Sequence, residues 1–111
     1  MNSTQLQTEF VTFQPQGYLS AANAEELSNE LTVAIKTSSN SPILIDMSEV
    51  EFMDSAALVV LIKAFRWCQN SGRKLSVCSV APSVKMIFEL TQLDKLIEIF
   101  ENRSSFEAAR N

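Results

Sequence analysis

Two adjacent residues, Asp54 and Ser55, stand where an acidic stretch meets a long apolar run. The run continues to about Asn70 with helical periodicity, which predicts a helix that begins at Ser55. The serine hydroxyl would then lie beside unpaired backbone N–H groups and the positive end of the helix dipole. We interpret Ser55 as a switch. Three further carboxylates precede the pair: Asp46, Glu49 and Glu51.

The same two residues also have plainer interpretations. Serine and aspartate are both favoured as the residue that caps a helix N-terminus, so Ser55 could simply be a cap. Asp54 carries the same ambiguity, since it could cap the helix or support the switch at Ser55. The acidic stretch could hold a divalent ion through its oxygen atoms, but no EF-hand pattern or glycine turn accompanies it. The sequence therefore predicts neither a metal site nor a cofactor.

The composition argues against an enzyme. The chain contains no histidine, which removes the usual general base, the commonest zinc ligand and any histidine-based triad. No Walker motif, Rossmann glycine pattern or GxSxG elbow occurs, so we predict no catalytic residue. Cys68 and Cys78 lack CxxC spacing and are expected to be reduced packing residues.

Charge and hydropathy limit the classes of partner. A net charge of −4 argues against general affinity for nucleic acid or anionic membranes. No apolar run approaches the roughly 18 residues that a membrane span needs, and residues 1–5 do not resemble a signal peptide. We expect a cytoplasmic protein without membrane insertion. The basic side chains are scattered and expected to be solvated, among them Arg66, Arg73 and Lys74.

The hydrophobic pattern along the chain alternates between strands and helices. Strands are predicted at 6–13, 18–19, 43–47, 74–80 and 96–100. Helices are predicted at 21–37, 55–70, from 82 onward and from 104 onward, and Asn23 with Glu26 has capping-box spacing. Residues 48–53 are expected to be a short connection. The order β-β-α-β-α-β-α-β-α predicts an α/β fold in one domain, residues 1–111, with a mixed, mostly parallel sheet of about five strands and about four helices.

The predicted helix 55–70 has two apolar faces. One of them should lie on the sheet and consists of Leu58, Leu61, Ile62 and Phe65. The opposite face is poor in charge for a solvated surface, which suggests a protein-binding strip. A neighbouring helix could cover this face instead, or its apolar residues could be exposed without a function. The proposed strip consists of Ala56, Val60, Lys63 and Trp67.

Three segments together resemble the STAS family of bacterial anti-sigma factor antagonists. The central one is Ile43-Leu44-Ile45-Asp46-Met47-Ser48-Glu49-Val50-Glu51-Phe52-Met53-Asp54-Ser55, which is similar to the family's strand followed by an Asp-Ser switch. Gly17-Tyr18-Leu19 with Asn23-Ala24, and the segment 90–99, are similar to the family's earlier and closing signals. The likeness covers nearly the whole chain and implies a STAS-like fold.

The resemblance also implies a regulatory cycle. In the family, the unphosphorylated antagonist binds an anti-sigma factor that is also a serine kinase, and the sigma factor is released. The kinase later phosphorylates the serine that follows the aspartate, which is Ser55 here, and a PP2C-type phosphatase restores the antagonist. The partners implied are thus the anti-sigma factor kinase and the phosphatase, with a homodimer left open.

The sequence departs from the family motif after Ser55. The family's Asp-Ser-Ser/Thr-Gly pattern appears as Asp54-Ser55-Ala56-Ala57, so the motif offers one hydroxyl only. Ala57 adds a methyl where a kinase loop would approach a glycine. Two alternatives therefore stand beside the switch. One is a constitutive STAS scaffold subunit of a transport or signalling complex, and the other is a nucleotide-binding sensor.

Overall fold

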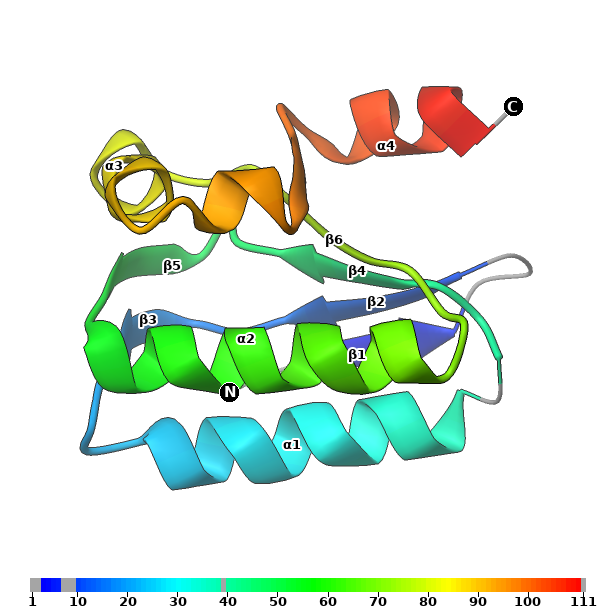
Figure 1. Cartoon of the computed structure of the whole chain (residues 1–111), viewed down its shortest axis with the longest axis horizontal. Coiled ribbons are helices and arrows are strands. Elements are labelled where there is room, and N and C mark those ends of the chain that lie inside the picture. Colours follow the sequence, from blue (N-terminus) through cyan, green and yellow to red (C-terminus); the bar gives the residue numbers. More distant parts are fainter. Residues whose placement is uncertain (1–2, 7–9, 39, 111) are drawn as a thin grey trace.

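The computed structural model describes residues 3–6, 10–38 and 40–110. Within them the chain forms four α-helices, one 3-10 turn and seven strands (Figure 1). The first half runs β1 (Ser3–Leu6), β2 (Val11–Gln14), β3 (Gly17–Leu19), α1 (Ala24–Thr37), β4 (Ile43–Asp46) and β5 (Val50–Met53). The second half runs α2 (Ser55–Asn70), β6 (Leu75–Cys78), α3 (Pro82–Leu90), η1 (Leu93–Lys95), β7 (Glu98–Phe100) and α4 (Arg103–Arg110).

The main sheet has the order β1-β2-β4-β6-β7. Only β1 runs antiparallel to its neighbour, and β2, β4, β6 and β7 pair in parallel. The central strand β4 contains Ile43, Leu44 and Ile45, all fully buried. A parallel strand with both faces covered reads as a continuous apolar run, which explains why this segment lacks polar alternation. The predicted mixed, mostly parallel α/β fold is confirmed.

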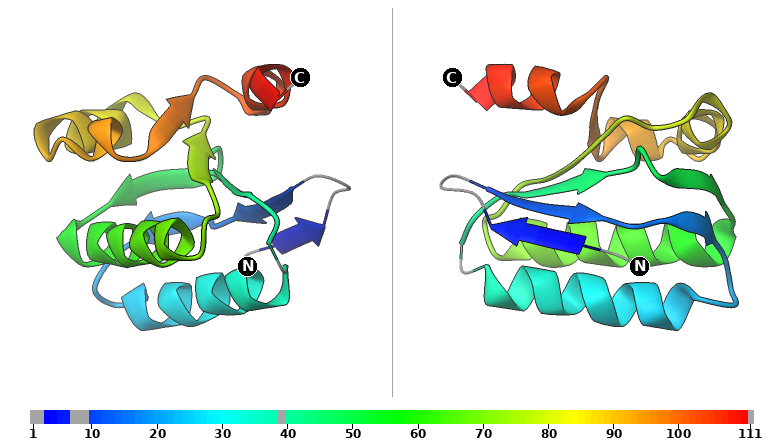
Figure 2. Two further views of the ribbon diagram at one scale, coloured as in Figure 1. Left: turned by 45° about the vertical axis from the view of Figure 1, so that its right-hand side comes forward. Right: turned by 180° about the vertical axis from the view of Figure 1, so that it is seen from behind.

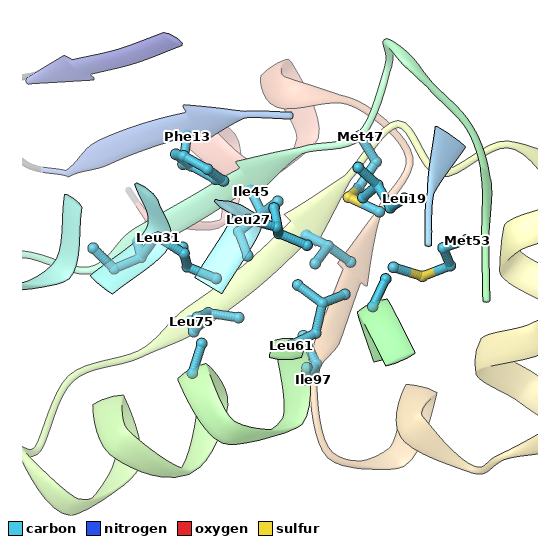
Figure 3. Close-up of a cluster of buried hydrophobic side chains, with 14 of the residues drawn as sticks. Phe13, Leu19, Leu27, Leu31, Ile45, Met47, Met53, Leu61, Leu75 and Ile97 are labelled. Carbon is cyan, nitrogen blue, oxygen red and sulfur yellow. The ribbon is translucent and has the colours of Figure 1, made fainter. Parts of the chain in front are cut away.

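Helices cover both faces of the sheet. α1 and α2 lie side by side along one face, and α4 lies on the other, as three views show (Figures 1 and 2). The large core fills the space between the sheet and the first two helices (Figure 3). A smaller cluster lies on the opposite face, beneath α4, and consists of Phe10, Leu44, Cys78 and Phe106, with Phe100 packed against it.

The structure corrects two predictions about strands. The single strand predicted at 6–13 is wrong, because the structure has two strands there, Ser3–Leu6 and Val11–Gln14, which pair antiparallel. Residues 7–9 lie outside the described part of the chain. Residues 50–53 are a strand, β5, which pairs in parallel with β3 in a separate two-stranded sheet. Alternating polarity could not reveal β5, because its burial pattern is in–out–out–in.

Two polar side chains also differ from expectation. Asn23 precedes α1 but makes no capping box, because its amide oxygen accepts the Ser20 N–H at 2.8 Å and its amide nitrogen donates to the Tyr18 carbonyl. Arg73 is buried, not solvated: its guanidinium donates to the carbonyls of Ile35 and Ser41. It thereby satisfies carbonyls at and beyond the C-terminal end of α1.

Two further findings concern the described residues as a whole. Both cysteines are free and buried, as predicted for packing residues. Among the residues described, no helix combines the length and the apolar character that crossing a bilayer requires.

Candidate functional site

Helix α2 begins with a side-chain cap, and the capping residue is Asp54. Its backbone is extended, and its Oδ1 accepts the N–H groups of Ala56 at 2.9 Å and Ala57 at 3.2 Å. These two donors would otherwise be unpaired at the start of the helix. The interpretation of Ser55 as the cap is therefore wrong, and Asp54 holds that role.

Asp54 also joins the helix to a loop far away in the sequence. Its second oxygen, Oδ2, accepts the Ala21 N–H at 3.0 Å, and its own N–H donates to the Leu19 carbonyl at 2.9 Å. The Ala21 bond is the main cause that lowers the pKa of the Asp54 carboxyl below its ordinary value, followed by the bond from Ala57. These donors bind the ionised form more tightly than the protonated one.

Ser55 is the first residue of α2, and its side chain is exposed. Within the described part of the chain, its hydroxyl makes no hydrogen bond. Because Asp54 satisfies the adjacent amides, the fold places no demand on this hydroxyl. The chain thus presents an exposed hydroxyl at a fixed position on its surface.

The backbone N–H groups at the start of α2 that are already hydrogen-bonded are not free to bind a phosphoryl group on Ser55. A bare helix N-terminus offers several N–H donors to an anion. Here the donors of Ala56 and Ala57 are already bound to a carboxylate. A phosphate on Ser55 would therefore add about 1.5 to 2 negative charges beside Asp54, with little local neutralisation. Its effect would fall on the surface of the molecule and on what that surface can bind.

The carboxylates before Asp54 do not converge on a metal site. Asp46 at the end of β4 accepts the Ser48 N–H at 2.9 Å, while Glu49 and Glu51 are exposed. In the residues that the structure describes, no group of three or more acidic, cysteine or histidine side chains could hold a metal ion.

The residues of the proposed strip on α2 differ in exposure. The buried face consists of Ala57, Leu58, Leu61, Ala64 and Cys68, which is centred about one residue from the predicted face. Ala56 and Val60 are therefore half-buried, and Val60 packs against the core. Lys63 is exposed, and Trp67 faces α1, where the Lys36 ammonium lies 6.0 Å from the centre of its ring. The strip lies beside the buried face, next to α1.

The Ala57 methyl does not reach the surface. Ala57 is fully buried in the large core cluster. The prediction that it would stand in the way of an approaching kinase loop is therefore wrong. Only Ala56, which is half-buried, changes the surface of the motif.

Three exposed apolar side chains near Ser55 were not predicted from the sequence as part of the site. Val59 is 47% exposed and follows Ser55 by one helical turn. Tyr18 and Phe52 are neighbours on β3 and β5, with ring centres 6.2 Å apart, and are 63% and 41% exposed. The signal for Val59 was its i+4 spacing from Ser55. The aromatic pair could be found only after β3 and β5 were known to pair.

A hollow of about 580 Å³ lies at the other end of α2. Its lining includes Gln69, Gly72 and Lys74, with Lys74 paired to Glu98 of β7 at 2.7 Å. It is thus separate from Ser55, and the described residues form no glycine-rich loop around it that would cradle the phosphates of a nucleotide.

Comparison with known proteins connects this geometry to one family. A family model described as STAS domain matches residues 3–106. The anti-sigma F factor antagonist of Paenibacillus polymyxa is 24% identical over 86 residues, which cover 78% of this chain and 74% of that protein.

Solved structures share the fold. Protein TM1081 of Thermotoga maritima superimposes with a TM-score of 0.89 at 23% identity, covering 99% of this chain and 95% of that one. The Bacillus cell fate determinant SpoIIAA in its phosphorylated form superimposes with a TM-score of 0.73 at 14% identity, covering 98% and 99% of the two chains.

Proposed function

This chain belongs to the STAS domain family, and from that membership we propose that it is an anti-sigma factor antagonist controlled by phosphorylation of Ser55. In its unphosphorylated form it binds an anti-sigma factor that is also a serine kinase, and this binding frees the sigma factor. The kinase then transfers the γ-phosphoryl group of ATP to the Ser55 oxygen. A PP2C-type phosphatase removes the group and restores the antagonist.

The observation that carries the proposal is the free hydroxyl of Ser55 at the start of α2. Asp54 caps the helix, so phosphorylation removes no hydrogen bond from the fold. The names of two matched proteins agree with the proposal, since one is called an anti-sigma F factor antagonist and another is described in a phosphorylated form.

The surface around Ser55 supports a protein partner. Val59 and Lys63 continue the exposed side of α2 from Ser55 at successive turns. The Tyr18–Phe52 pair adds a second apolar patch on the small sheet that leads into α2. Ala56, Val60 and Trp67 extend the contact toward α1. Tryptophan and tyrosine are over-represented among the interface positions that dominate binding energy.

A phosphate would switch this surface off through charge. A dianion buried in an interface without a matching cation is costly, and Asp54 next to it increases the repulsion. Glu49 and Glu51, two exposed carboxylates that precede α2 in the chain, act in the same direction. The fold itself stays intact, so the phosphorylated protein remains ready for the phosphatase.

The test is phosphate mapping. The chain is incubated with ATP and the anti-sigma factor kinase of its own organism, and the products are digested and examined by mass spectrometry. We expect one phosphate, on Ser55, and none in the Ser55→Ala variant. Phosphate on another residue, or on none with a kinase that binds the chain, would overturn the switch.

A binding experiment separates the switch from its alternative. Pull-downs compare the wild type with Ser55→Asp and Ser55→Ala. We expect Ser55→Asp to lose at least tenfold in affinity, while Ser55→Ala binds and is never released by ATP.

A constitutive STAS scaffold is the second candidate, and Ala56 favours it, because the motif has one hydroxyl where relatives carry two. It predicts a partner that co-purifies equally with the wild type and with Ser55→Asp. Loss of the partner with Ser55→Asp would exclude it.

A further inference from the structure

Helix α4 is attached to the rest of the molecule differently from the other helices. α1 buries four residues and α2 buries five, whereas α4 buries Phe106 alone. The Phe106 ring packs edge-on against Phe10 of the segment before β2, at 4.9 Å between ring centres, and against Phe100 of β7, at 5.3 Å. Figure 1 shows α4 on the face of the sheet opposite to α1 and α2.

Several polar contacts of α4 hold the helix together without tying it to the sheet. The Arg103–Glu107 ion pair, at 3.6 Å, joins two residues of α4. The Asn102 side chain accepts the Ser105 N–H at 2.8 Å and caps the same helix. The Arg103 and Arg110 guanidiniums also each lie 5.4 Å from the centre of the Phe10 ring, so two cation–π contacts of partly exposed side chains add to the packing of Phe106.

The sheet surface on this side is not fully satisfied. Thr12 of β2 and Ser76 of β6 pair in register with Leu44 on either side, so all three face the side of α4. Both hydroxyls are buried, and neither has a hydrogen-bond partner among the described residues. A buried hydroxyl without a partner is destabilising, and access to water would relieve it.

From these observations we propose that α4 is a detachable cover, which opens as a unit about the Glu101–Asn102 segment while the rest of the fold stays intact. Opening removes one aromatic side chain from a small cluster and breaks none of the hydrogen bonds within α4. It uncovers the sheet face that carries Phe10, Leu44 and Cys78, and it hydrates Thr12 and Ser76. This sheet surface is covered by α4 in the closed state, and it lies on the side of the sheet opposite to α2, the helix that begins at Ser55.

The two free cysteines report on this opening. Cys78 of β6 lies under α4 in the small cluster, whereas Cys68 is on the buried face of α2 in the large one. Burial raises the pKa of both thiols, so neither reacts while it is covered. Opening of α4 uncovers Cys78 alone, but Cys68 becomes accessible only when α2 leaves the sheet.

The experiment is thiol labelling of the full chain with iodoacetamide in native buffer, with each cysteine followed by peptide mass spectrometry. In the wild type we expect Cys78 to react at least tenfold faster than Cys68, with a weaker dependence on urea at low concentration. Phe106→Ala removes contacts that are absent from both the open and the unfolded state, so it should accelerate Cys78 at least another tenfold while Cys78 keeps its lead over Cys68.

Val84→Ala is the matched control, because Val84 is a buried residue of α3 in the large cluster. Val84 stays packed when α4 opens and loses its contacts only on global unfolding, so the variant should accelerate Cys68 and leave Cys78 nearly unchanged. Equal rates for the two cysteines in the wild type, or parallel acceleration of both in Val84→Ala, would show that α4 leaves only with global unfolding and would overturn the proposal.

Discussion

The side chain of Asp54 carries three backbone hydrogen bonds from two separate segments. Its Oδ1 accepts the hydrogen bonds from the start of helix α2, and its Oδ2 accepts the hydrogen bond from the Ala21 N–H. Asparagine at this position could still accept the helix amides through its oxygen, but its NH2 group cannot accept from Ala21. The two functions of Asp54 are therefore separable by mutation.

We predict that Asp54→Asn destabilises the fold and that Asp54→Ala destabilises it more, because alanine loses both functions. Urea unfolding at pH 7, followed by circular dichroism, measures the difference. If the two variants unfold at the same urea concentration, the helix cap contributes nothing beyond the Ala21 bond.

The pH dependence gives a second prediction for Asp54. Its pKa is lowered in the folded state, compared with about 3.9 in an unfolded chain. The unfolded state therefore takes up the proton first as pH falls, and the stability from this carboxylate is present above pH 4 to 5 and lost below it. Between pH 5 and pH 3 the free energy of unfolding should fall more steeply for the wild type than for Asp54→Asn. Equal slopes would contradict the lowered pKa.

At the scale of elements, buried Arg73 connects two loops. It follows α2 and donates to the Ile35 and Ser41 carbonyls and to the Ser38 hydroxyl, all at or just beyond the end of α1. The sequence could not reveal this role, because an arginine beside Lys74 in a chain of scattered cations resembles solvated surface. Only the packing of α1 against α2 brings its partners within reach.

We expect Arg73→Met to cost about 2 to 4 kcal/mol, because it leaves several buried acceptors unpaired. Arg66→Met is the matched control, since Arg66 is exposed on α2, and it should stay within about 0.5 kcal/mol of the wild type. Chemical unfolding measures both. A loss below 0.5 kcal/mol for Arg73→Met would mean that water replaces the guanidinium.

The small sheet of β3 and β5 leads to a prediction about binding. Tyr18→Ser and Phe52→Ser should each weaken binding to the proposed anti-sigma factor by tenfold or more, which is about 1.4 kcal/mol. Stability should change less for Tyr18→Ser than for Phe52→Ser, because Tyr18 is 63% exposed and Phe52 is 41% exposed. Met86→Ser, on the exposed side of α3, serves as the control and should bind like the wild type. Calorimetric titration distinguishes the three variants.

Sequence patterns predicted those elements whose burial follows a regular period. The four helices and the central strand are long or uniformly apolar, and their positions were predicted closely. β5 failed because Val50 and Met53 are buried while the two residues between them are not. The inward face of α2 was predicted about one residue away from its true centre. Ala57 and Ala64 are buried, but their small side chains contribute little to a hydrophobic pattern dominated by leucine.

The candidate site was predicted in part for the same reason. Asp54 and Ser55 are adjacent in the sequence, so their position at a helix start followed from the pattern alone. Their separate roles could not be predicted from the pattern, because they depend on a hydrogen bond from the Ala21 N–H, which lies in another part of the chain. Tyr18 and Phe52 likewise meet only through the pairing of β3 with β5.

At the scale of the whole molecule, charge should govern how fast the partner associates. The chain has a net charge of −4, and carboxylates gather before α2. Complementary charge accelerates diffusional encounter, and salt screens it over about 8 to 10 Å. We predict that the association rate with the anti-sigma factor falls several-fold between about 50 and 500 mM NaCl, while the dissociation rate changes less. Stopped-flow mixing measures both rates, and a salt-independent association rate would contradict steering.

The bond between Asp54 and the Ala21 N–H has a thermodynamic consequence for recognition. It fixes the loop before α1 to the start of α2 in the free protein, so both segments are in place before any partner arrives. A surface ordered in advance loses little conformational entropy on binding. Weakening this tether would therefore appear as a larger entropic penalty of association, even though Asp54 need not touch the partner.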